Sequence, residues 1–166
     1  MPGAVRRDDW FVLLDPTWQT ENPSGDPPVE AIVGGWRLDK NGSLGPFQSN
    51  PRYIPRNDST PTDPIDALLR LIANGDDCSD QIIPTLRNTV VQLACDSQDQ
   101  LCIAPAPDDV TCALVVTAEV HKQRLNVPHW WAILGAQLPE VIPVGIDVLF
   151  NPGGEHQFRL TTEAIR

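Results

Sequence analysis

Histidine and cysteine are the residue types in this chain that most often act as nucleophiles, general bases or metal ligands. Three histidines could together hold a metal ion, and a cysteine beside a histidine could form a nucleophile and its base. Each histidine, however, stands alone in a context typical of a surface or hydrogen-bonded side chain, so we expect neither catalysis nor metal binding. The residues concerned are His121, His129, His156, Cys78, Cys95, Cys102 and Cys112.

The spacing of the four cysteines contains no C-x-x-C pair, which argues against a structural zinc site. We expect reduced thiols, because no secretory leader is recognisable in the sequence. One alternative stays open. If Gln98 and Asp99 form a two-residue hairpin loop, Cys95 and Cys102 lie opposite each other on neighbouring strands and could form a disulfide.

Acidic side chains are concentrated in the middle of the chain. The net charge is −10, and residues 61–110 alone contain nine acids and two bases, which gives −7. This charge argues against nucleic acid and anionic membranes as partners, because phosphate contacts need Lys and Arg. Asp76, Asp77 and Asp80 match no calcium loop, and we expect them to cap a following helix. The acidic stretch is either a solvated surface or a face for a basic partner.

The stretch Asn151-Pro152-Gly153-Gly154 is predicted to be a turn between two strands. Adjacent glycines can bind a phosphate through their backbone amides, but in such loops a helix follows directly, and no helix is predicted here. Glu155 would also repel a phosphate. We therefore expect a structural turn, with a recognition loop as the alternative.

Tryptophan supplies a different kind of candidate. Trp130 and Trp131 are adjacent, so their side chains point in different directions and at least one is expected to be partly exposed. Exposed tryptophan is common in binding hot spots, although one that merely covers a sheet edge is also consistent with this pattern. No G-x-S-x-G, H-E-x-x-H, Walker A or G-x-G-x-x-G motif is present, so we predict no enzymatic activity and no cofactor.

Hydrophobic patterning predicts the elements that position these residues. Thr62 or Asp63 caps a helix that has Pro64 in its first turn and ends at Gly75. Asn41-Gly42 predicts a hairpin turn. Strands are predicted at residues 10–15, 30–38, 44–47, 89–96, 101–104, 111–117, 145–150 and 156–160. Further helices are predicted from Ser79 or Pro84 to about Asn88, at 118–125 and at 130–138, with a helical turn from residue 161.

This order of elements predicts an α+β fold, with a mixed, largely antiparallel sheet and a few short helices packed on it. The 17 prolines concentrate in the connections. We expect a single compact domain over residues 1–166. It comprises a β-rich, proline-rich part (1–60), a helical segment (61–88) and a second β-rich part (89–166). No apolar run is long enough to span a membrane, and we expect a cytoplasmic protein.

Taken together, two sets of sequence stretches resemble known families. The C-terminal set consists of residues 111–118, 130–131, 138–141, 145–154 and 158–160, and the N-terminal set of residues 12–18, 33–53 and 61–76. The C-terminal stretches are similar to the SseB-like domain, in which a strand ending in Thr precedes a hydrophobic strand running into Asn-Pro-Gly and then an Arg/Leu strand. The N-terminal stretches are similar to actinobacterial type VII secretion system-associated proteins.

The resemblance implies an accessory component of a secretion system, with no catalytic motif to carry over. We therefore predict a non-enzymatic protein–protein interaction module, an accessory or chaperone-like factor whose partner is a secretion substrate or component. The alternative is an immunity protein that neutralises a secreted toxin through its acidic surface. A Cys- or His-dependent hydrolase is a third hypothesis. The predicted partner-binding residues are Trp36, Tyr53, Trp130, Trp131, Asn151, Gly153 and Gly154.

Overall fold

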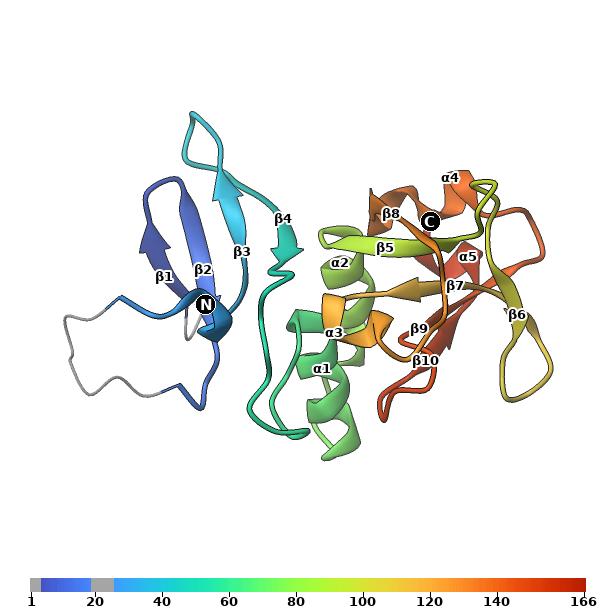
Figure 1. Ribbon diagram of the computed structural model, residues 1–166, viewed down its shortest axis with the longest axis horizontal. Helices are drawn as coiled ribbons and strands as arrows, with labels where there is room; N and C mark the ends of the chain where they lie inside the picture. The colour runs from blue at the N-terminus through green and yellow to red at the C-terminus, as the bar shows by residue number, and fades with distance from the viewer. Residues whose placement is uncertain (1–3, 19–25) are drawn as a thin grey trace.

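Two β-sheets with short helices between and around them form the protein (Figure 1). The computed structural model describes residues 4–18 and 26–166. The fold class predicted from the sequence is confirmed: it is a compact α+β domain with largely antiparallel strands. The strands are nevertheless divided between two separate sheets, which the order of predicted elements did not reveal.

The first sheet has the order β1-β2-β3-β4 and is antiparallel throughout. Its strands are β1 (Ala4–Arg7), β2 (Trp10–Leu14), β3 (Ile32–Leu38) and β4 (Leu44–Ser49), with a 3-10 turn, η1 (Val29–Ala31), before β3. Gly42 has φ 81° in the predicted hairpin turn. A Cβ at Gly34 would lie 2.4 Å from the Gln48 carbonyl oxygen, so glycine here allows the two backbones to approach closely.

The second sheet has the order β10-β9-β7-β5-β8, with β6 also paired to β7. The β7–β9 ladder is parallel, and the other ladders described for this sheet are antiparallel. The strands are β5 (Val90–Cys95), β6 (Ile103–Pro105), β7 (Thr111–Val116), β8 (His129–Leu134), β9 (Asp147–Phe150) and β10 (Phe158–Leu160).

Helices cover one face of this second sheet. Ile65, Leu86, Leu138 and Ile165, one from each of four helices, are fully buried in one cluster with Phe150 and other strand residues. A smaller cluster of Ala94, Ala106, Cys112, Leu114 and Leu149 lies on the opposite face, as strand alternation requires. The helices are α1 (Pro64–Ala73), α2 (Ile82–Arg87), α3 (Glu119–Lys122), α4 (Leu138–Val141) and α5 (Thr162–Ile165), with 3-10 turns η2 (Ser79–Gln81) and η3 (Gly135–Gln137).

The predicted helix at residues 130–138 is wrong. These residues form the edge strand β8, and then η3 and α4 follow. All six residues of β8 pair with β5, so tertiary pairing decides the conformation of a short apolar run that is ambiguous in sequence. β1 was not predicted at all, and none of its four side chains is fully buried.

The predicted hairpin after β5 forms only in part. Cys95 pairs with Leu101 in an isolated bridge, and β6 then pairs with β7. Because neighbouring strand residues point to opposite faces, this register turns Cys102 away from Cys95. Both thiols are free, so the disulfide alternative is not realised. The expected capping by acids is found only in part. Asp80 lies in the first turn of η2, where a carboxylate favours the helix dipole, but neither Cys78 nor Gln81, the N-cap residues of η2 and α2, makes a side-chain cap hydrogen bond.

Candidate functional site

Polar side chains meet where the parallel strands β7 and β9 end. Thr117 follows β7 and Asn151 follows β9, so both lie at the carboxyl edge of the pair. The Thr117 amide donates to Asn151 Oδ1 at 2.9 Å, and Asn151 Nδ2 donates to Thr117 Oγ1 at 2.9 Å. Asn151 has φ 50°, a conformation that asparagine tolerates better than most residues. The predicted turn therefore begins with Asn151, whose buried side-chain amide accepts one hydrogen bond from Thr117 and donates another to it.

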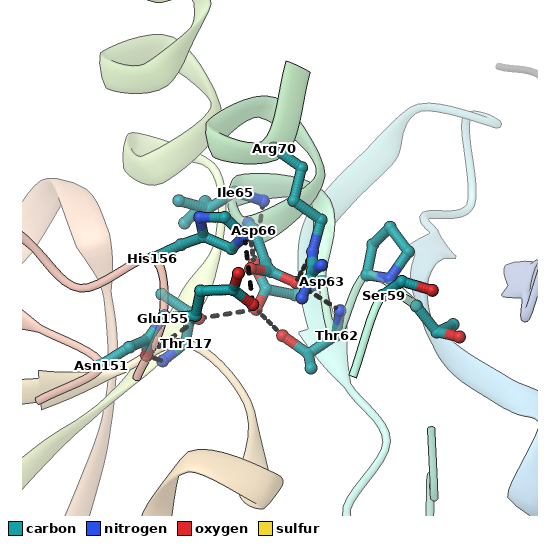
Figure 2. A network of polar contacts seen from close by, with 12 residues as sticks. Ser59, Thr62, Asp63, Ile65, Asp66, Arg70, Thr117, Asn151, Glu155 and His156 are labelled. Carbon is teal, nitrogen blue, oxygen red and sulfur yellow. Dashed lines mark hydrogen bonds and ion pairs between the residues drawn. The ribbon is translucent and has the colours of Figure 1, made fainter. Parts of the chain in front are cut away.

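Asp63 connects this edge to helix α1 (Figure 2). As the N-cap, its Oδ1 accepts from the Ile65 and Asp66 amides at 2.8 and 3.1 Å. Its Oδ2 accepts from the hydroxyls of Thr62 at 2.9 Å and Thr117 at 2.6 Å. The side chain is fully buried. Burial raises the pKa of Asp63, and the hydrogen bond from Thr117 opposes that shift.

His121 extends the network through Thr62. Its Nε2 lies 2.9 Å from Thr62 Oγ1, and its Nδ1 lies 2.8 Å from Arg124 Nη1. Arginine can only donate, so Nδ1 accepts and the ring hydrogen is on Nε2. His121 therefore donates to Thr62, which donates to Asp63. Burial lowers the pKa of His121 below 6.5. The charges of Asp63 and Asp66 oppose this shift, and those of Arg124 and Arg70 add to it. Neutral imidazole is the form that fits this geometry.

Asp66 and Arg70 form the other side of the network. Asp66 Oδ2 accepts from the Thr62 amide at 3.0 Å and from Arg70 Nε at 2.9 Å. The i,i+4 spacing on α1 places the two side chains together. Throughout the described residues, every buried side-chain nitrogen and oxygen has a hydrogen-bond partner. The interior of the network is thus complete, and its reactive groups are engaged with one another.

A pocket of about 250 Å³ opens above this network. Its walls come from the loop after the first sheet, from α1 and α3, and from the turn after β9. Asp66, Arg70, His121 and Arg124 line it, together with His156. No three His, Cys, Asp or Glu side chains within residues 4–18 and 26–166 are placed to share a metal ion. The accessible chemistry is that of hydrogen bonding and charge pairing.

Three of the predicted site residues lie at this pocket. Asn151 and Gly154 line it, and a Cβ at Gly153 would lie 3.9 Å from Arg124 Cδ. The other four lie elsewhere. Trp131 is 40% exposed on β8. Trp130 points to the opposite face, where Lys122 Nζ lies 5.4 Å from its ring centroid.

Trp36 and Tyr53 belong to the first sheet and its following loop. The Trp36 ring contacts Phe47 edge-on, with ring centroids 4.9 Å apart. Tyr53 is 7% exposed and its hydroxyl donates to Asp15 at 3.1 Å. Burial and the Asp15 carboxylate raise the pKa of Tyr53. In this structure both rings pack within the protein, and Tyr53 fixes its loop to the first sheet.

The acids of residues 61–110 do not form one face. Asp63 and Asp66 are buried in the network. The exposed or partly exposed acids divide between the end of α1 and the turns around β5–β7, which lie at separate places in Figure 1. These two groups are Asp76, Asp77 and Asp80, and Asp96, Asp99, Asp108 and Asp109. Asp108 is also paired with Arg159 at 2.6 Å. The expectation of a single acidic face is therefore corrected.

The sequence did not single out Thr117, Arg124 or Arg70, and His121 was considered only for catalysis or metal binding and set aside. Thr117 and Asn151 each follow a hydrophobic strand directly, and that shared position was the available indication. It becomes informative only when β7 and β9 are known to be parallel neighbours. Asp63 was predicted as a cap, which is confirmed, but its contact with Thr117 spans 54 positions.

Comparison with known proteins adds no functional assignment: no family model, curated protein or solved structure matches this chain. The described residues also contain no helix with the length and apolar character needed to cross a membrane.

Proposed function

We propose that this protein is a non-enzymatic protein–protein interaction module, an accessory or chaperone-like factor of a type VII secretion system acting in the cytoplasm. The observation that carries the non-enzymatic part is the 2.8 Å contact between Arg124 Nη1 and His121 Nδ1. Because Arg124 donates to Nδ1, Nε2 holds a hydrogen and points it at Thr62. A general base would have to accept the hydroxyl proton at that position. The geometry therefore favours a structural role for His121.

The cysteines support the same conclusion. Burial raises the pKa of all four thiols above the ordinary value of 9.0. The reactive form of cysteine is the thiolate, and these environments disfavour it. Cys78 also faces the charges of Asp76, Asp77 and Asp80, which act in the same direction. A hydrolase that depends on Cys or His is thus the least favoured hypothesis.

The edge strand β8 is the surface that we propose for a protein partner. It lies at one end of the second sheet and pairs with β5 on one side. Its exposed residues include His129, Trp131 and Ala132. An edge strand offers unpaired backbone groups for strand addition, and an exposed tryptophan beside it supplies an anchor.

The secretion role itself is inferred from the resemblance of the sequence stretches to the two families named above. The immunity alternative has less support, because its proposed acidic surface is divided between separate places and two of its acids are buried. A basic nuclease would need a continuous acidic face over its substrate groove.

The test is affinity capture from the organism that encodes the protein, with captured proteins identified by mass spectrometry. Trp131→Ala is compared with Leu44→Ala, since Leu44 is a 45% exposed apolar residue on the first sheet. We expect the unmodified protein and the Leu44 variant to capture the same secretion component or substrate, and the Trp131 variant to lose it. Capture of no secretion protein, or equal capture by both variants, contradicts the proposal.

A further inference from the structure

Two arginine side chains at the pocket have hydrogen-bond donors without a protein acceptor. Arg70 donates a hydrogen bond from Nε to Asp66, and Arg124 donates one from Nη1 to His121. Across the described residues, neither guanidinium makes another hydrogen bond, although each has five N–H groups. The Arg70 side chain is only 20% exposed and lines the pocket, so its remaining donors are accessible there.

Arg124 is also held in place against the turn. A Cβ at Gly154 would lie 3.6 Å from its Nη1, so the guanidinium lies beside the glycine backbone. Its contact with His121 fixes the other side. Among the residues described, no carboxylate lies within ion-pair distance of Arg124, whereas Arg70 is paired with Asp66. In a chain of net charge −10, this leaves an exposed cation at the pocket that has no ion-pair partner among the described residues.

The other charged groups of the pocket limit which anion it can hold. Asp58, Asp66 and Glu155 also line it. They repel a phosphate dianion about twice as strongly as a singly charged carboxylate at the same distance. A planar carboxylate also matches the two parallel N–H groups of a guanidinium. The volume of about 250 Å³ suits a small group or one chain terminus.

We propose that this pocket is a carboxylate-binding site, in which Arg124 and Arg70 hold the two oxygens of the ligand. The carboxylate belongs either to a free small acid or to the terminus of a peptide. The site is separate from the β8 surface, and it can exist whether or not the secretion role is correct.

The experiment is a titration followed by ¹H–¹⁵N NMR at pH 7 and constant ionic strength. N-acetylglycine supplies the carboxylate, and N-acetylglycinamide, which lacks only that charge, is the matched ligand control. We expect saturable shifts at the amides of Val120–Arg124 and Gly153–His156 with N-acetylglycine, with a Kd of roughly 1–10 mM for a single charged group. The neutral amide should produce none of these shifts. Inorganic phosphate should bind more weakly.

Arg124→Gln should weaken N-acetylglycine binding at least about tenfold, the loss expected for a hydrogen bond to a charged group. Arg6→Gln removes the same charge from an exposed position on β1 and should leave the affinity unchanged. Arg124→Lys keeps the charge but not the planar fork, and should fall between the two.

The proposal is overturned if no saturable shift occurs up to about 50 mM, well above the expected Kd range. It is also overturned if the neutral amide or phosphate binds as well, or if Arg124→Gln and Arg6→Gln behave alike. Free glutamate and an N-acetylated tripeptide then distinguish the source. Tighter binding of glutamate indicates a free acid, and tighter binding of the tripeptide indicates a chain terminus.

Discussion

The first sheet encloses a cluster of three buried apolar side chains, Val33, Phe47 and Tyr53, whereas the helices and strands of the second sheet bury eleven in their main cluster, counted over the described residues. The second sheet also carries the buried polar network around Asp63. Apolar burial contributes roughly 25 cal/mol per Å², so the second sheet has far more stabilising contact. We infer that the first sheet depends on its junction with the second.

That junction is specific. The Phe47 amide donates to the Asn88 carbonyl at 2.8 Å, and Phe47 forms a parallel bridge with Thr89 at the start of β5. Its ring meanwhile fills the small cluster of the first sheet. The comparison between the two regions therefore predicts two kinds of effect. Substitutions in the polar network should lower the stability of the whole protein, and substitutions in the first sheet should destabilise that sheet alone.

The largest effect is expected at Asp63. Asp63→Ala leaves two backbone amides and two buried hydroxyls without their acceptor, and should lower the free energy of unfolding by about 3–5 kcal/mol. Urea unfolding measures this. Asp63→Asn keeps an oxygen for the helix cap and should lose less. A loss below about 1 kcal/mol for the alanine variant, the worth of an ordinary hydrogen bond, would contradict the central place of the network.

The next effect should be confined to the first sheet. Gly34→Ala places a Cβ 2.4 Å from the Gln48 carbonyl oxygen and should cost about 1–3 kcal/mol by overpacking. Hydrogen exchange should show faster exchange in β3 and β4, with β5, β7 and β9 unchanged. Gly45→Ala is the control, because its closest contact would be 3.1 Å. Equal acceleration in both sheets would show that they unfold as one unit.

Two glycine turns give a direct comparison of the regions. Gly42 and Gly153 have φ of 81° and 73°, so alanine at either position should cost about 1 kcal/mol. Only Gly153→Ala lies beside Arg124, so only this variant should shift the NMR resonances of His121 and Arg124. Identical shifts from both variants would show that the turn at Gly153 has no specific contact with the pocket residues.

The smallest effect concerns pH. The pKa of His121 lies below its ordinary value of 6.5 in the folded protein, so the unfolded chain binds more protons in the window just below pH 6.5. Stability from this group is therefore full above pH 6.5 and falls as the pH drops toward the folded pKa. Compared with His121→Gln, the unmodified protein should lose its advantage progressively as the pH falls below 7, because the unfolded chain takes up the histidine proton around pH 6.5, before the folded protein does. If the stability advantage of the unmodified protein instead grew on acidification, the pKa of His121 would have to be raised by folding rather than lowered.

Local chemistry made much of the fold predictable. Asp63, Pro64 and Gly75 mark the start and end of α1 because capping, proline placement and a positive φ are properties of neighbouring residues. The Asn41-Gly42 turn and the buried run of β7 were predictable for the same reason. The α+β class follows from these elements.

What the sequence left hidden depends on contacts between distant residues. The strand conformation of Trp130 and Trp131 is set by pairing with β5, and the division into two sheets depends on which strands become neighbours. Of the residues that line the candidate pocket, only Asn151 and Gly154 were among the predicted partner-binding residues. The role of His121 was hidden because its partner Thr62 is 59 positions away, and Arg124 meets the turn after β9 only in the folded structure.

The parallel pairing of β7 and β9 bears on how the chain folds. Thr117 and Asn151 are 34 positions apart, and Thr117 and Asp63 are 54 apart. Three segments must therefore be brought together, at the cost of loop-closure entropy, before the network is complete. We expect the cluster to assemble after the folding transition state, so that it governs mainly how slowly the native molecule opens rather than how fast it forms.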